Sequence, residues 1–108
     1  MSRLPTTTES TPALKLPPIH PGEVLCDELA ELGLSANAMA LALDVPSKCI
    51  AEILDGMRAV NADTALRLAR YFGTSPRFWL NLQLSYDLAV AERERGESIT
   101  RRVHPRAA

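Results

Sequence analysis

Four polar side chains within a short stretch have the types and the spacing needed to contact double-stranded DNA: Ser47, Lys48, Glu52 and Arg58. Serine and lysine can donate hydrogen bonds to base edges or phosphates, and glutamate can accept one from the amino group of cytosine. Arginine can pair with guanine or hold a phosphate. These residues therefore predict a DNA contact, provided that the surrounding elements present them on an exposed helix face.

Cysteine and histidine positions do not suggest a metal site, a disulfide or a catalytic centre. The chain contains Cys26, Cys49, His20 and His104, with no CxxC pair and no clustered ligand set. No histidine that could activate the thiol of Cys49 lies close to it in sequence. We expect a protein that is not an enzyme and that uses no cofactor, no metal and no small-molecule substrate.

The polar stretch lies within a series of segments whose boundaries are typical of helices. Proline suits the first helical turn, serine and asparagine cap helix starts, and glycine ends helices. The expected helices begin at Pro21, Ser35, Pro46, Asn61 and Ser75 and end before Gly33, Asp44, Gly56, Gly73 and Gly96. No segment shows strand periodicity, and aromatic residues make up only 5% of the chain. We therefore expect an all-α fold of five helices with a long C-terminal helix.

The second and third expected helices form a helix-turn-helix pattern. A small residue at Ala40 allows the two helices to approach closely, a tight turn at residues 43–45 separates them, and Ile50 faces back. The second helix of such a pair projects its N-terminal residues outward, where a major groove about 12 Å wide can accept it. An ordinary helical hairpin with a solvated polar face fits the spacing equally well.

The length of 108 residues indicates one domain with two tails. We expect a flexible arm over residues 1–18, a folded domain over 19–96 that includes a dimerisation helix over 75–95, and a flexible tail over 97–108 that is made basic by Arg101, Arg102 and Arg106. No hydrophobic run approaches the ~20 residues of a membrane span, and no apolar signal-peptide region follows Met1. The expected location is the cytoplasm.

The net charge of −1 is the sum of two differently charged regions. Residues 21–45 carry five acidic and no basic side chains, whereas residues 46–80 carry five basic and three acidic ones. The first expected helix contributes the acidic residues Glu23, Asp27, Glu28 and Glu31. This acidic face could meet a basic partner; a solvated acidic face is the alternative interpretation.

The long C-terminal helix has two apolar stripes on nearly opposite sides. One of them consists of Leu80, Leu84, Leu88 and Ala91. A helix of a five-helix domain needs only one apolar stripe for its own core, so we expect the second stripe to be covered by another subunit in a two-fold homodimer. The alternative is that both stripes belong to the core of one chain.

Four stretches of the sequence resemble the HigA family of antitoxins, which belongs to the Xre or Cro/C1-type helix-turn-helix class. They are HPGEVL at 20–25, LGLS at 32–35, ADTALRLARYFGTSP at 62–76 and FWLNLQ at 78–83. The resemblance spans about residues 20–103 and implies a lambda-repressor-like domain. It implies a protein that represses its own operon by binding operator DNA and that neutralises a partner toxin of the HigB or RelE type, which cleaves mRNA.

The resemblance also implies roles for particular residues. It places Ser35 and Asn37 as phosphate contacts, and it makes a basic toxin the candidate partner of the acidic helix face. The chain departs from the family pattern at three positions: Ala36 replaces a common glutamine, Asp44 stands where glycine is usual, and Cys49 replaces a polar residue. Ala36 removes a phosphate or base contact and lowers the expected DNA affinity.

Two alternatives to a repressing antitoxin remain open. A stand-alone Xre-type repressor would have no toxin partner. A protein-binding inhibitor would have weak DNA affinity, which Ala36 and the net charge of −4 over residues 19–96 favour.

Overall fold

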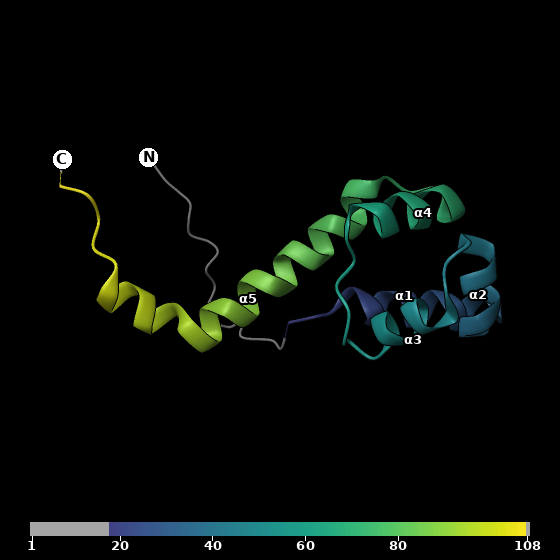
Figure 1. Cartoon of the computed structure of the whole chain (residues 1–108), viewed down its shortest axis with the longest axis horizontal. Coiled ribbons are helices and arrows are strands. Elements are labelled where there is room, and N and C mark those ends of the chain that lie inside the picture. Colours follow the sequence, from purple (N-terminus) through teal and green to yellow (C-terminus); the bar gives the residue numbers. More distant parts are fainter. Residues whose placement is uncertain (1–17, 108) are drawn as a thin grey trace.

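The computed structural model describes residues 18–107, which form five helices and no strand. The helices are α1 (Pro21–Leu32), α2 (Ala36–Leu43), α3 (Ser47–Leu54), α4 (Ala62–Phe72) and α5 (Pro76–Arg102). The first four helices and the start of α5 form a compact body, and the rest of α5 extends away from it (Figure 1). The all-α fold of five helices is confirmed, while residues 1–17 of the expected N-terminal arm lie outside the described part of the chain.

The helix starts follow the local sequence closely. Ser35, Asn61 and Ser75 each accept a hydrogen bond from a backbone N–H of the first turn of the following helix, which satisfies one of the donors that a helix start leaves unpaired. At α1 this role falls to His20, whose Nδ1 accepts from the backbone N–H of Gly22 at 2.9 Å. Glu23 accepts in return from the backbone N–H of His20 at 3.4 Å, so one of the four acidic residues of α1 belongs to its N-cap.

The C-terminal end of α5 differs from the prediction. The helix does not stop before Gly96 but continues through it to Arg102, so the expected flexible tail over 97–108 is wrong for residues 97–102. A glycine inside a helix costs only about 1 kcal/mol relative to alanine. Glu97 and Arg101 pair at 3.8 Å one turn apart, and arginines in the last turn favour a helix C-terminus.

The core lies where α1, α2, α3 and α4 meet the first turns of α5. Its largest fully buried side chains are Trp79, Leu25, Met39, Ile50, Ile53, Leu68 and Pro21. Trp79 enters from α5, and its indole Nε1–H donates to Thr74 Oγ1 at 2.9 Å. The buried Gln83, one turn further along α5, accepts from the backbone N–H of Val60 at 2.8 Å. These contacts anchor the N-terminal part of α5 to the body that carries α2 and α3.

The whole of α5, with its 27 residues, is about 40 Å long at 1.5 Å per residue. None of the helices within residues 18–107 is long and apolar enough to cross a membrane.

Candidate nucleic-acid interface

The turn between α2 and α3 has the geometry of a tight helix-turn-helix turn. Asp44 ends α2 with φ 58° and ψ 49°, and it is the one non-glycine residue with positive φ among the residues described. Aspartate tolerates this left-handed conformation better than most residues but less well than glycine. The backbone N–H of Val45 then donates to Ala40 O at 3.0 Å, which closes the turn and sets the direction in which α3 begins.

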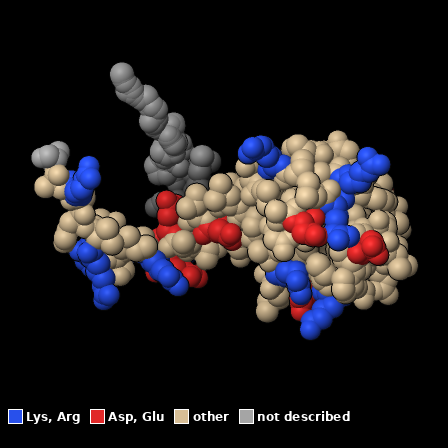
Figure 2. All heavy atoms as spheres, turned by 45° about the horizontal axis from the view of Figure 1, so that its top comes forward, with Lys and Arg blue, Asp and Glu red and all other residues tan. Residues whose placement is uncertain are grey.

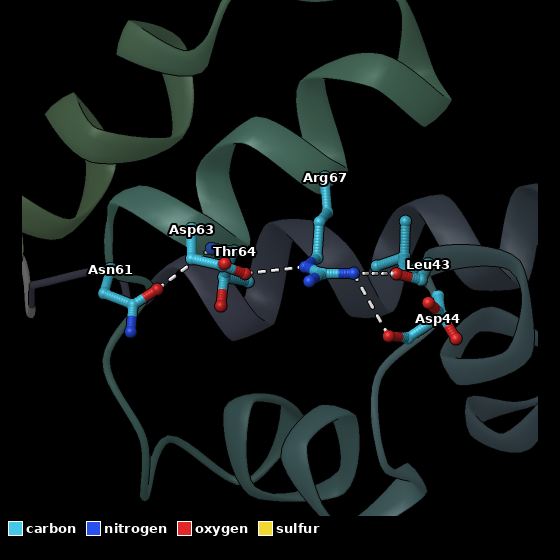
Figure 3. A network of polar contacts seen from close by, with 6 residues as sticks. All are labelled: Leu43, Asp44, Asn61, Asp63, Thr64 and Arg67. Carbon is cyan, nitrogen blue, oxygen red and sulfur yellow. Dashed lines mark hydrogen bonds and ion pairs between the residues drawn. The ribbon is translucent and has the colours of Figure 1, made fainter.

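A side chain from α4 holds this turn in place (Figure 3). Arg67 Nη1 donates to the carbonyl oxygens of Leu43 at 2.8 Å and Asp44 at 3.1 Å. Its Nε donates to Asp63 at 2.6 Å, and this hydrogen bond and the carboxylate charge raise the pKa of Arg67 above its usual value. Arg67 therefore uses carbonyl groups at the end of α2 that have no partner inside the helix.

Sequence reasoning did not identify Arg67 as part of the site. The i, i+4 spacing of Asp63 and Arg67 was a visible signal for a pair on α4, but the carbonyl oxygens that Arg67 also holds lie 23 and 24 residues away.

Of the four polar residues proposed first for DNA contact, three lie on α3 and Arg58 lies in the loop after it. Lys48 is 80% exposed and lies 3.8 Å from Glu52. Arg58 reaches back from the loop, with Nε and Nη2 at 2.8 and 2.7 Å from Glu52 Oε1, and this contact raises the pKa of Arg58. Ser47 is exposed at the first position of α3. The structure thus joins Lys48, Glu52 and Arg58 into one charged group beside Ser47.

In this group Glu52 is engaged by two cations, which changes its expected role. An acceptor that already binds Lys48 and Arg58 is poorly placed to accept from a cytosine amino group. Its geometry instead suits it to orient Arg58 toward the surface that α3 presents. Glu52 stays a predicted site residue, but as one that positions Arg58.

The two α2 positions proposed as phosphate contacts are both exposed. Ser35 Oγ accepts from the backbone N–H of Ala38 at 3.1 Å, so its hydroxyl proton is left to donate. Asn37 lines a shallow hollow at the junction of α2 and α3 together with Ser47. The chain folds so that residues from both helices border the same depression.

Two of the three residues that depart from the family pattern are half-buried. Cys49 is half-buried and packs against the core, where a small, weakly polar side chain is well tolerated. Ala36 is also half-buried against the core.

On the face of the compact body that Figure 2 shows, basic and acidic groups alternate. This distribution matches the near-zero net charge. A net charge near zero limits non-specific attraction to DNA phosphates.

Only part of the apolar stripe predicted to form the dimer interface on α5 is exposed to solvent. Leu84 and Leu88 are 56% and 54% exposed, and Ala91 is exposed. Leu80 is half-buried against the core of its own chain, because it lies within the anchored part of α5. The surface available to a second subunit therefore begins at Leu84.

The four acidic residues of α1 differ in exposure and in role. Asp27 and Glu31 are exposed, whereas Glu28 is half-buried. Glu23 is exposed but serves the N-cap of α1. The acidic face that remains for a partner is formed by Asp27, Glu28 and Glu31.

Comparison with known proteins identifies relatives of the same architecture, although no family model matches the chain. The virulence-associated protein I of Dichelobacter nodosus is 52% identical over 89 residues, which cover 80% of this chain and 82% of that protein. The structure of an addiction module antidote protein of the HigA family from Coxiella burnetii is 49% identical with a TM-score of 0.81, covering 84% of this chain and 100% of that one.

A further solved structure is that of the Pseudomonas aeruginosa antitoxin HigA with the higBA promoter. It is 45% identical with a TM-score of 0.80 and covers 83% of this chain and 99% of that chain. Identity at this level over nearly the whole described region, on the same five-helix architecture, shows that the chain belongs to the HigA family of helix-turn-helix antitoxins.

Proposed function

We propose that this protein is the antitoxin of a toxin–antitoxin module, that it neutralises a HigB- or RelE-like mRNA-cleaving toxin, and that as a homodimer it binds operator DNA and represses its own operon. The observation that carries the DNA-binding part is the start of α3, where Ser47 and Lys48 are exposed and Glu52 holds Arg58 beside them. The solved HigA antitoxin with promoter DNA, at 45% identity, supports the same function. The protein is not an enzyme in this proposal and acts in the cytoplasm, where operator DNA lies.

Recognition would proceed by insertion of α3 into the major groove. Lys48 and Ser47 would contact base edges, and Arg58 would contact a guanine or a phosphate. Ser35 and Asn37, on α2, would contact phosphates of the backbone. Arg67 would keep the turn rigid, so that α3 meets the groove without further ordering.

The DNA-binding proposal is tested by a gel shift with the promoter region of the protein's own gene at about 100 mM salt. Lys48→Ala should weaken specific binding by about 1 to 3 kcal/mol if Lys48 reads a base. Arg93→Ala, which removes one positive charge from the exposed part of α5, is the matched control and should bind nearly as wild type does. Unchanged affinity of Lys48→Ala would remove Lys48 from the interface. A wild-type protein with no specific shift would instead favour a pure protein-binding inhibitor.

The homodimer is proposed to form through the exposed stripe of α5 that begins at Leu84. A two-fold axis there would present two copies of α3 to half-sites about 34 Å apart. Sedimentation of Leu84→Glu beside wild type tests this interface, and a monomeric variant with a dimeric wild type is the expected result. Leu66→Glu, at a residue of α4 that is also exposed, should leave the dimer intact. Two monomers, or two dimers, would refute the interface.

The toxin part is tested by co-purification with the protein encoded by the neighbouring gene. We expect a stable complex and loss of that protein's mRNA cleavage in its presence. A neighbouring gene whose product neither binds nor cleaves RNA would indicate a stand-alone repressor.

A further inference from the structure

A small hollow opens between α1 and the junction of α4 and α5, on elements other than those that carry the proposed DNA contacts. It is lined by Val24, Glu28, Phe72, Thr74, Phe78 and Trp79. We propose that this hollow receives one cationic side chain, an arginine or a lysine, from the basic surface of the toxin partner. This inference rests on the proposed antitoxin function and deepens it by naming where the toxin docks.

The size of the hollow fits a side chain and not a small metabolite. Its volume is about 140 Å³. Pockets for small-molecule ligands usually measure about 300–1,000 Å³. An occupant of this size that also extends back to a protein surface is a single long side chain.

The lining of the hollow is suited to a cation. Three aromatic rings border it and pack on one another, with ring centroids 5.1 Å apart for Phe78 and Trp79 and 5.7 Å apart for Phe72 and Trp79. The Nε1–H of Trp79 is already bonded to Thr74 and Trp79 is only 1% exposed, so the accessible ring surface comes from Phe78 and the half-buried Phe72. Aromatic rings attract a guanidinium or ammonium group placed within about 6 Å of their centroids.

The carboxylate of Glu28 supplies the charge that such an occupant needs. Glu28 is the half-buried acidic residue of α1, and within residues 18–107 no ion pair engages it. Asp27 and Glu31 stand exposed beside it on α1, a helix without a single lysine or arginine. A toxin that binds RNA is basic, so its charge is complementary to this surface.

Phe78 gives the hollow a partly exposed aromatic ring. It is next to the buried Trp79 on α5 and is 43% exposed, so part of its ring is open to a partner. Aromatic side chains are enriched where protein partners meet, and a side chain that enters the hollow would cover this ring.

The position of the hollow lets toxin and operator bind at the same time. Its lining comes from α1, α4, α5 and the α4–α5 connection, whereas the proposed DNA contacts lie on α2, on α3 and in the loop after α3. A docked toxin would therefore leave the start of α3 free.

The test measures binding of the neighbouring gene's protein product to the full-length chain by titration calorimetry. Glu28→Gln removes the charge and keeps the shape, and Phe78→Ala opens the mouth of the hollow. Each should weaken binding at least tenfold, and the loss for Glu28→Gln should shrink at high salt. Glu94→Gln, at an exposed glutamate of α5, should bind as wild type does. The fluorescence of Trp79, the single tryptophan of the chain, should change when the partner binds.

Operator affinity provides the second readout, because a variant that merely damages the fold would lose DNA binding as well. The proposal requires Glu28→Gln and Phe78→Ala to retain wild-type gel shifts while they lose partner binding. If the unmodified chain binds the partner and both variants bind it with the same affinity, the proposed docking site is refuted. The proposed antitoxin function is not affected by that result. If the unmodified chain does not bind the partner, the toxin half of the proposed function is refuted, and the occupant proposed here is refuted with it.

Discussion

Replacement of Gly22 by alanine should destabilise the protein strongly, because α1 crosses α3 at this residue without room for a side chain. A Cβ added at Gly22 would lie 1.9 Å from the carbonyl oxygen of Ile53 and 2.9 Å from its carbonyl carbon. Real Cβ atoms essentially never come within 3.0 Å of another heavy atom in this way, so the two helices must separate by about 1 Å. The obstacle is backbone, which cannot rotate aside as a side chain can.

The expected loss of unfolding free energy follows from two opposing effects. Overpacking a well-packed contact costs about 1–3 kcal/mol, and the upper end applies here because the clash is with a carbonyl group. Replacing glycine by alanine in a helix returns up to about 1 kcal/mol. The net loss is about 2 kcal/mol, which lowers the melting temperature of a domain of this size by about 8–16 °C.

Gly96→Ala is the matched control, because it makes the same chemical change in a helix where space is available. Apart from its chain neighbours and the backbone of its own helix, the atom nearest to its added Cβ is Glu92 Cβ at 3.9 Å, an ordinary contact distance. This variant should be more stable than wild type by about 0.5–1 kcal/mol.

The free energy of unfolding of both variants is measured by urea unfolding followed by circular dichroism. One protomer concentration is used throughout, because the stability of a dimer depends on concentration. We expect shifts of opposite sign. A Gly22→Ala protein within about 0.5 kcal/mol of wild type, where ordinary surface substitutions fall, would refute the reasoning from the close approach of α1 and α3.

Three further changes have expected outcomes in the same unfolding measurement. Gln83→Leu should lower stability by about 1–3 kcal/mol, since it leaves the buried backbone N–H of Val60 without its acceptor; an unchanged midpoint would show that water replaces the amide. Asp44→Gly should raise stability by up to about 1 kcal/mol, because glycine adopts the positive φ of this position without strain, and a loss would mean that the aspartate side chain stabilises the turn. Trp79→Phe should cost about 2 kcal/mol through lost volume and the lost bond to Thr74, less than the 3–5 kcal/mol typical of truncation to alanine, and a neutral result would contradict its place in the core.

Local sequence signals were sufficient to predict the helices, because each start and most stops depend on nearby residues. Ser35, Asn61 and Ser75 cap the helices that follow them, and Gly33 and Gly73 end theirs in the left-handed conformation. The same reasoning was wrong at Gly96, where no left-handed turn follows and the helix continues. A glycine ends a helix only when the chain after it must turn away, and that depends on what the following residues can contact.

The residues of the candidate DNA interface were predicted by type and spacing, but their mutual arrangement was not. Whether Glu52 reads a base or orients Arg58 depends on how the loop after α3 folds back, which brings residues six positions apart to 2.7 Å. The clamp of Arg67 on the end of α2 and the hollow beside Glu28 join residues that are more than 20 positions apart.

The sequence by itself therefore determined the five helices, the helix-turn-helix and the family, since capping, periodicity and short motifs are written in neighbouring residues. The tertiary structure alone decided which polar groups are already engaged, which apolar residues stay open and where α1, α4 and α5 leave a hollow. Those properties follow from the packing of helices against one another, and packing is set by contacts between distant parts of the chain.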